Sequence, residues 1–377
     1  MAAEQLHIPI PAREPNDGFP IPAGEKASFV TGEPIFVEAV AGVNVPSVSK
    51  ATPPLVNIDL LVVVTTGLAN NLGPNLMTRL NFLVTRANTS YADSEVGINL
   101  RLVGVMVANY SDATSNSAAL DAVTPNRAPF DAATFGGVEA FRTQVKADMV
   151  ALLRNGSGFS GSGVAWIGGN APNPSFQYSV TTGCVAACEN VFIHELGHNM
   201  GNMHDRATVA WQAGGTGTYG AGANPYAYGY AFCRSGALSC NPQLPNGTAG
   251  ACQPTSSANA QPECSTNDAS NFSEIMAYFY NTTDTIYKFS NPAITCASPT
   301  GDGVPRPCGI LEPGVGTTVF TGSANTAASM NITRTGISAI KTGDVNPAGI
   351  LSFTAPTYSG TEAGGTVVLT VARTNGS

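Results

Sequence analysis

The sequence predicts an α/β fold in which a largely parallel sheet is covered by helices. Three observations support this prediction: apolar β-branched runs, stretches with helical spacing, and their alternation along the first 200 residues. Parallel strands are buried on both faces and therefore read as continuous apolar runs. Strands that alternate with helices are typical of α/β layer folds. The chain of 377 residues is long enough for one large domain or two modest ones.

Five segments are predicted as strands of this sheet. The first, Val56–Thr66, is apolar and β-branched and is bounded by Pro54 and Gly67. The others are Ile98–Ala108, Asp148–Leu153, Gly163–Gly168 and Phe176–Thr182. Because Gly163–Gly168 is short and bounded by glycines, we expect it at an edge of the sheet.

Helices are predicted between these strands. Leu76–Tyr91 has apolar residues at helical spacing and follows Pro74, which suits a helix start. Further helices are expected at Ala133–Val145 and from about Cys188 to Met200. After His204 the chain is rich in Gly, Ser, Asn and Pro, which predicts a loop-rich second half.

The composition disfavours nucleic acid and anionic membranes as partners. The net charge is −8 and no run of Lys or Arg occurs, so no basic surface for phosphates is expected. No segment approaches the ~20 apolar residues of a membrane-spanning helix. We expect a monomer without a membrane span.

Charge and N-terminal sequence bear on where the protein acts. Charged residues make up 11% of the chain, against about 25% in ordinary soluble domains, and this favours a secreted protein. The segment MAAEQLHIPIPARE lacks the basic start and apolar core of a signal peptide. If the protein is secreted, its signal is absent from this chain.

The chain has eight cysteines, none before Cys184, and their even number indicates disulfides formed in an oxidising compartment. They are Cys184, Cys188, Cys233, Cys240, Cys252, Cys264, Cys296 and Cys308. A structural zinc site is the alternative, but no CxxC pair occurs. Proximity in sequence favours a Cys296–Cys308 pair.

The densest group of candidate functional residues is the stretch HELGHNMGNMHD. His194 and His198 are four residues apart and share one helix face, where two imidazoles can hold one metal ion. Gly201 readily adopts the positive φ that ends a helix, so the chain can turn back and bring His204 to the same ion. Three protein ligands leave a fourth position open, as a catalytic zinc site requires.

Glu195 lies one step round the helix from the first of these histidines. It can reach a water activated at the zinc and act as general base in the hydrolysis of a peptide carbonyl. A bare HExxH pattern often occurs by chance on an ordinary helix. Here Gly201 and His204 extend the pattern, and three of the four histidines lie within it, which favours the zinc site.

These residues and a second motif resemble the metzincin clan of zinc proteases. The clan signature HExxHxxGxxH matches His194 to His204, and SEIMAY, Ser273–Tyr278, resembles the clan's Met-turn. An aspartate directly after the third histidine, here Asp205, is the mark of reprolysins (adamalysins) within the clan. The chain resembles the bacterial, secreted members of this family. The segments GSGVAWIGG, YSVTTGC, YGY and FSNP are similar to the same family. The resemblance covers about residues 55–300.

The resemblance implies a zincin fold with a mixed, mostly parallel five-stranded sheet and an irregular, disulfide-linked lower subdomain. We therefore expect an upper catalytic subdomain with the zinc-binding helix in 51–204 and a lower subdomain with the Met-turn in 205–348. Residues 1–50, rich in proline, are a leader or pro-segment remnant, or equally a disordered linker. The resemblance also implies that a protein or peptide substrate pairs in extended form with Gly163–Gly168. The alternative for that segment is an ordinary edge strand.

The resemblance extends to the metal and to three more residues. It implies one catalytic zinc ion (Zn2+) held by His194, His198 and His204. It makes Met276 structural, beneath the metal, and Asp205 a buried acceptor. Tyr278, two residues after Met276, either contacts the metal site and stabilises an oxyanion, as in astacins, or packs in the core.

Residues 349–377 look like the start of a Calx-beta domain. The features are a strand, a Tyr-x-x-x-Glu turn, a Gly-Gly turn and the run TVVLTVART. A complete β-sandwich needs ~100 residues, so the domain is truncated or these strands form a β-hairpin. Calx-beta domains can bind Ca2+, but this piece is too short for a complete site, so calcium is not predicted.

Three functions follow from these patterns. The resemblance implies a secreted zinc-dependent endopeptidase with Glu195 as general base. A catalytically silent extracellular binding or adhesion module with the protease fold is the first alternative, but the presence of Glu195 and all three histidines argues against it. A zinc hydrolase acting on other amides or on cell-wall peptides is the second, and the clan's extended cleft favours a protein substrate instead.

Overall fold

The structure is a computed structural model. It describes residues 34–36, 53–156, 162–169, 172–212, 222–235, 264–277, 284–311, 322–341, 350–353 and 371–374.

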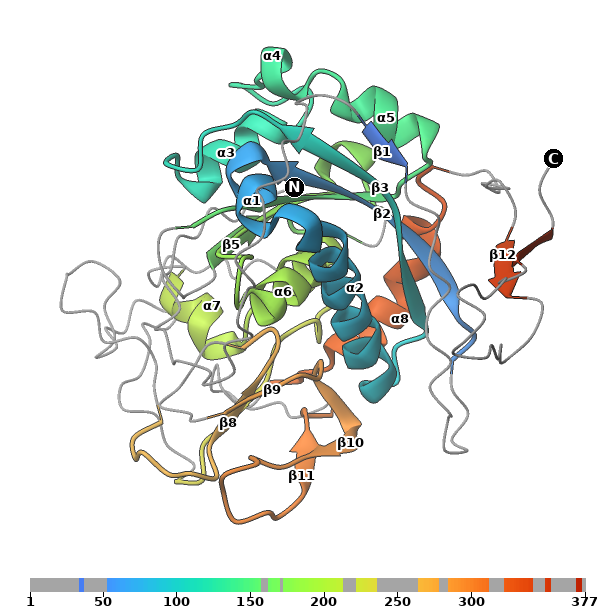
Figure 1. The fold of residues 1–377 in the computed structure, drawn as a ribbon. Helices are drawn as coiled ribbons and strands as arrows, with labels where there is room; N and C mark the ends of the chain where they lie inside the picture. The colour runs from blue at the N-terminus through green and yellow to red at the C-terminus, as the bar shows by residue number, and fades with distance from the viewer. Residues whose placement is uncertain are drawn as a thin grey trace, which may run out of the picture.

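Six strands form one mixed sheet, in the order β1-β3-β2-β4-β6-β5 (Figure 1). They are β1 (Pro34–Phe36), β2 (Val56–Thr65), β3 (Ile98–Ala108), β4 (Met149–Arg154), β5 (Ser162–Ala165) and β6 (Tyr178–Thr182). The four inner strands are parallel, whereas β1 and β5 run antiparallel at the two edges. All five predicted strands lie in this sheet, and β1, from the expected leader, extends it by one.

The inner strands are apolar because helices cover both faces of the sheet. In β2, Ile58 and Leu60 point to one core, and Leu61 and Val63 point to the other. The first core packs against α1 (Thr66–Leu72), α2 (Leu76–Asp93), α6 (Glu189–Asn199) and α8 (Thr326–Ile337). The second packs against α3 (Asn116–Val123), α4 (Ala132–Phe135) and α5 (Val138–Gln144). Figure 1 shows these three layers.

Two predictions for these elements need correction. The helix expected at Ala133–Val145 is split into α4 and α5 because Gly136 and Gly137, both poor helix formers, separate them. The edge strand expected at Gly163–Gly168 is Ser162–Ala165, after which the chain keeps only a single bridge at Trp166.

Helix α8 was not predicted, because its sequence, TAASMNITRTGI, is rich in residues of modest helix propensity. It forms because Ala327, Met330 and Ile337 pack in the same core as β2 and α6. Its N-cap residue Asn325 accepts a hydrogen bond from the Ala328 N–H at 3.0 Å.

The chain after His204 contains more regular structure than the loop-rich prediction. The elements are α7 (Arg206–Gln212), β7 (Ala231–Phe232), β8 (Phe272–Glu274), β9 (Asp284–Ile286), β10 (Asn291–Cys296) and β11 (Arg306–Cys308). Strands β7, β8 and β9 form one small sheet and β10 and β11 another, and both lie below α6 in Figure 1. Phe272 and the Cys296–Cys308 disulfide form a small apolar core between them.

Three disulfides join the described cysteines: Cys184–Cys188, Cys233–Cys264 and Cys296–Cys308. The disulfide interpretation and the predicted Cys296–Cys308 pair are therefore confirmed. Cys240 and Cys252 lie outside the described residues.

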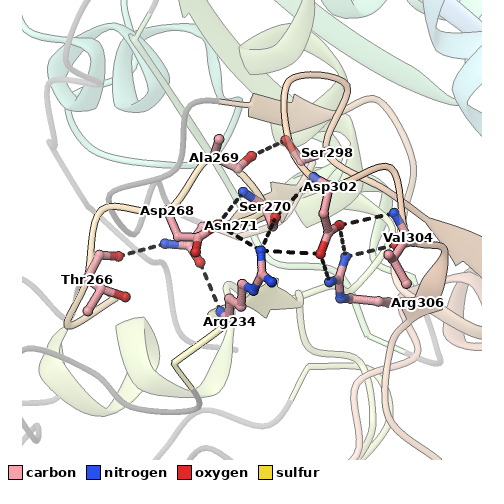
Figure 2. A network of polar contacts seen from close by, with 10 residues as sticks. All are labelled: Arg234, Thr266, Asp268, Ala269, Ser270, Asn271, Ser298, Asp302, Val304 and Arg306. Atoms are coloured by element: carbon pink, nitrogen blue, oxygen red, sulfur yellow. Dashed lines mark hydrogen bonds and ion pairs between the residues drawn. The ribbon is translucent and has the colours of Figure 1, made fainter.

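A polar network holds two loops of this region together (Figure 2). Asp302 forms ion pairs with Arg306 and Arg234, and Arg234 also pairs with Asp268. Hydrogen bonds from Arg306 hold the pKa of Asp302 well below its usual value, so this carboxylate is ionised at neutral pH. The network therefore ties the segment after Cys264 to the loop before β11.

Near the C-terminal end of the chain, two short strands form a pair. Strands β12 (Ile350–Phe353) and β13 (Val371–Thr374) pair antiparallel, and the Calx-beta assignment of this segment stays a prediction. Among the described residues, no helix is long and apolar enough to cross a membrane.

Candidate metal centre

Helix α6 carries His194, Glu195 and His198, and its apolar side fixes its position under the sheet. Phe192, Ile193 and Leu196 are buried in the main core. At its C-terminal end, the side-chain amide of Asn199 donates to the carbonyls of Trp166 and Tyr178 at 2.9 and 3.0 Å. The helix is therefore anchored to the segment that follows β5 and to β6.

Gly201 ends the helix and turns the chain back. Its φ is +90°, and its N–H donates to the His198 carbonyl at 2.8 Å. A Cβ at this position would lie 2.5 Å from the Cβ of Ala223, so only glycine fits here. The predicted role of Gly201 in returning the chain is confirmed.

The turn brings His204 back to the two histidines of the helix. The Nε2 atom of His204 lies 3.1 Å from that of His194 and 3.0 Å from that of His198. Two nitrogen ligands of one tetrahedral zinc lie roughly 3.3 Å apart, as the Zn–N distances of about 2.0–2.1 Å require. The three imidazoles could therefore hold one metal ion, with their ligand atoms within 4.8 Å of one another.

Backbone carbonyls orient two of the imidazoles. The Nδ1–H of His194 donates to the Ile275 carbonyl at 2.7 Å, and that of His198 to the Asn202 carbonyl at 2.8 Å. Each ring therefore presents its unprotonated Nε2 to the shared centre, which is the tautomer that binds metals. Burial, together with the other two histidines, lowers the pKa of His194 well below 6.5, so this ring is neutral near pH 7.

A turn at residues 274–277, here called the Met276 turn, packs against helix α6. It contains Ile275, the partner of His194, and Met276, which is fully buried. A Cβ on Gly197 would lie 2.5 Å from the sulfur of Met276. The glycine of HELGH therefore allows this turn to approach the helix between the two histidines.

Glu195 is 4% exposed and lies against the edge strand β5. A Cβ on Gly163 would lie 2.4 Å from its Oε1 atom and 2.7 Å from its carboxyl carbon. Gly163 and Glu195 are 32 positions apart, so this contact leaves no signal in the spacing of the sequence. The structure thus brings the candidate base and the candidate substrate strand together.

Two predicted residues of the site remain, Asp205 and Tyr278. Asp205 is 5% exposed and accepts a hydrogen bond from the Thr208 N–H at 2.9 Å, at the start of α7. Tyr278 lies outside the described residues. The backbone partners Ile275 and Asn202 were missed from the sequence because any residue type can supply a carbonyl.

Comparison with known proteins decides the family of this chain. A model of the metallo-peptidase family M12B, reprolysin-like, matches residues 56–304. The chain belongs to this family. The predicted resemblance to reprolysins is therefore confirmed, and membership places this reprolysin-like chain among metallopeptidases, which hydrolyse peptide bonds.

Individual relatives match parts of the chain. The peptidyl-Asp metalloendopeptidase of Stenotrophomonas maltophilia (strain K279a) is 27% identical over 195 residues, which cover 50% of this chain and 40% of that protein. The protein of the same name from Pseudomonas aeruginosa is 31% identical over 174 residues, which cover 42% and 27%. The chain thus spans less than half the length of these relatives.

Among solved structures, metalloproteinase-II from Bacteroides fragilis is 17% identical to this reprolysin-like chain. Its TM-score is 0.28, and the match covers 45% of this chain and 49% of that one.

The donor set of the site fits the metal that the family implies, typically zinc. Imidazole nitrogens are ligands that zinc prefers, and two of the three rings make the backbone hydrogen bond that metal-binding histidines usually make.

Proposed function

We propose that the chain is a secreted zinc-dependent endopeptidase whose metal is held by His194, His198 and His204. The convergence of the three Nε2 atoms carries this proposal, because two rings are oriented by backbone carbonyls toward a common centre. A zinc ion bound there supplies a Lewis acid that polarises the scissile carbonyl and activates water.

The residues of the chain would supply the remaining chemistry. Glu195 accepts the proton of the attacking water at its carboxylate and passes it to the nitrogen of the leaving amine. Its contact with β5 supports this role, since the carboxyl lies against Gly163. The Met276 turn keeps His194 in its metal-binding orientation through the Ile275 carbonyl.

The substrate would bind along β5 as an added strand. This strand ends the sheet order and pairs only with β6 among the described strands. An extended peptide on its other side would form backbone hydrogen bonds with the edge and place a carbonyl near the histidines. The division into an upper part, residues 51–204, and a lower part, residues 205–348, on either side of this peptide belongs to the same proposal.

Casein hydrolysis by the purified chain tests this function. We expect cleavage that stops when a chelator removes the metal and resumes when one equivalent of zinc is added back. Hydrolysis that survives complete removal of metal would contradict the proposal. If the chain holds zinc and cleaves nothing, the silent binding module is the better account.

The names of the relatives suggest a cleavage-site preference that peptide substrates can test. Both are called peptidyl-Asp metalloendopeptidases, so we propose that this chain also cleaves at aspartate. Peptide pairs that differ only by Asp and Asn should then differ in kcat/KM. Equal values for the two peptides would remove this preference.

Gly163 provides a prediction that depends on the proposed base. Replacing Gly163 by alanine places a methyl group against the Glu195 carboxyl, which must move, and a displacement of roughly 1 Å can cost about 100-fold in rate. We expect kcat to fall by about that factor while zinc content stays at one equivalent. Gly169→Ala is the matched control, since nothing lies within 4 Å of a Cβ there. Equal kcat values for the two variants would disprove the positional argument.

Tyr278 is proposed as an oxyanion donor, with core packing as the other interpretation. If Tyr278 stabilises the oxyanion, Tyr278→Phe lowers kcat more than it raises KM. Steady-state kinetics on the casein-derived peptides checks this expectation, and an unchanged kcat assigns the residue to the core.

Secretion is supported by the paired cysteines. Disulfides persist in oxidising compartments, and six cysteines are paired in the described part of the chain. We expect alkylation of the native, unreduced protein to label none of these six. Labelling of several of them would argue for a reducing compartment.

A further inference from the structure

Glu274 is a fully buried carboxyl group at the end of β8, directly before Ile275 and Met276. Buried acidic side chains are rare unless hydrogen bonds satisfy them. The hydrogen-bond partners of Glu274 therefore indicate its structural role.

One carboxyl oxygen of Glu274 joins two separate segments of the chain. Its Oε1 atom accepts hydrogen bonds from the Tyr230 N–H at 2.9 Å and from the Met276 N–H at 3.1 Å. The side chain thus ties the Met276 turn to the segment around Tyr230.

Each of these two segments contacts a different histidine of the metal centre. Ile275, in the turn, accepts the hydrogen bond from His194. The segment around Tyr230 begins at Ala227, whose carbonyl accepts from the Met203 N–H at 2.8 Å, and the Gly229 N–H lies 3.3 Å from the His204 carbonyl. Glu274 therefore connects the support of His194 to the support of His204.

The backbone at Gly229 lies very close to Glu274 and to the Met276 turn. A Cβ on Gly229 would lie 2.6 Å from Oε1 of Glu274 and 2.7 Å from the Met276 carbonyl oxygen. The backbone at residue 229 can approach the carboxyl group only because it carries no side chain.

We propose that Glu274 is a positioning residue that holds the Met276 turn against the segment 227–230 and so keeps His194 and His204 in metal-binding geometry. The inference rests on the proposed function, because it assumes that these histidines bind zinc.

Burial supports an acceptor role rather than a role as a negative charge. Burial, with the nearby Asp205 as a smaller cause, raises the pKa of Glu274 to about 8, so the carboxyl group is largely protonated at neutral pH. A neutral acid keeps the Oε1 acceptor that both backbone N–H groups need. Glutamine would supply the same acceptor in nearly the same volume.

Zinc affinity of the full chain tests the proposal. The zinc dissociation constant would be measured by competition with a chromogenic chelator for the parent, Glu274→Gln, Glu274→Asp and Glu274→Ala. We expect Glu274→Gln to match the parent within about threefold. Glu274→Ala should weaken zinc binding by about 10–100-fold, the usual cost of losing a partner that supports a metal ligand. Glu274→Asp should weaken it as well, because the shorter side chain cannot reach both N–H groups.

Asp148→Ala is the control for a general loss of stability. Asp148 is also a buried carboxyl, 3% exposed, but its partners are the backbone N–H groups of Asp59 and Lys341, on other elements. Its replacement should lower the melting temperature and leave the zinc dissociation constant unchanged. The absorption spectrum of the cobalt-substituted protein gives a second readout, which should shift in Glu274→Ala and not in Asp148→Ala.

The outcomes separate this inference from the proposed function. If the parent binds no zinc, the proposed function fails, and the role of Glu274 fails with it. If the parent binds zinc and Glu274→Ala or Glu274→Asp binds it equally well, only the positioning role is overturned. Weak binding by Glu274→Gln also overturns it, because the acceptor geometry is retained in that variant; this arm decides the question if Glu274→Ala does not fold.

Discussion

Replacing Glu195 by glutamine is expected to lower kcat for casein peptides by about 10²–10⁴-fold, the usual contribution of a general acid–base group. Glutamine keeps the shape of the side chain that lies against Gly163, but it cannot accept the proton of the attacking water. The metal ligands are untouched, so zinc content should stay at one equivalent. Single-turnover kinetics with zinc measured on the same samples checks both expectations.

Glu189→Gln is the matched control for this variant. Glu189 lies on the same helix and forms an ion pair with Arg79, away from the histidines. We expect this control to keep kcat within about twofold, because the ion pair lies in the first turn of α6, before the residues of the metal centre. A Glu195→Gln variant that retains kcat within tenfold of the parent would exclude Glu195 as the general base.

Replacing His204 by alanine is expected to remove zinc from the protein during dialysis against a mild chelator. The variant keeps only the two histidines of α6, and the loss of a ligand should exceed the 10–100-fold cost of losing a mere supporting partner. Because His204 lies beyond the turn at Gly201, helix α6 and its buried face should remain folded. Zinc content by atomic absorption and helix content by circular dichroism check the two parts.

His7→Ala is the control, since His7 is the only histidine of the chain outside the motif. It should retain one equivalent of zinc under the same dialysis. Zinc content in His204→Ala equal to that of the parent would remove His204 from the ligand set.

The sequence predicted the sheet well because its strands are buried on both faces. Val56–Thr65 and Ile98–Ala108 read as continuous apolar runs, and their observed bounds differ little from the predicted ones. The convergence of the three histidines was predicted because it depends on one short stretch of sequence. The spacing of His194 and His198 on a helix, and a glycine before His204, specify local geometry that needs no knowledge of the rest of the fold.

Features that depend on contacts between distant segments were not predicted. Helix α8 forms because Met330 and Ile337 pack in a core that strand β2, about 270 positions earlier, helps to build. The need for glycine at position 163 comes from Glu195, and the need at position 197 comes from the sulfur of Met276. Glu274 reads in the sequence as an ordinary acidic residue, and only its burial and its two backbone partners show that it joins two segments.

In the proposed function, three imidazoles hold a catalytic zinc ion. X-ray absorption spectroscopy at the zinc edge of the purified chain tests it most directly. We expect three nitrogen neighbours with imidazole scattering at about 2.0–2.1 Å and one further light-atom neighbour, with one equivalent of zinc per chain. A shell of sulfur at about 2.3 Å would place the zinc on cysteines instead, and either that result or the absence of bound zinc would contradict the account.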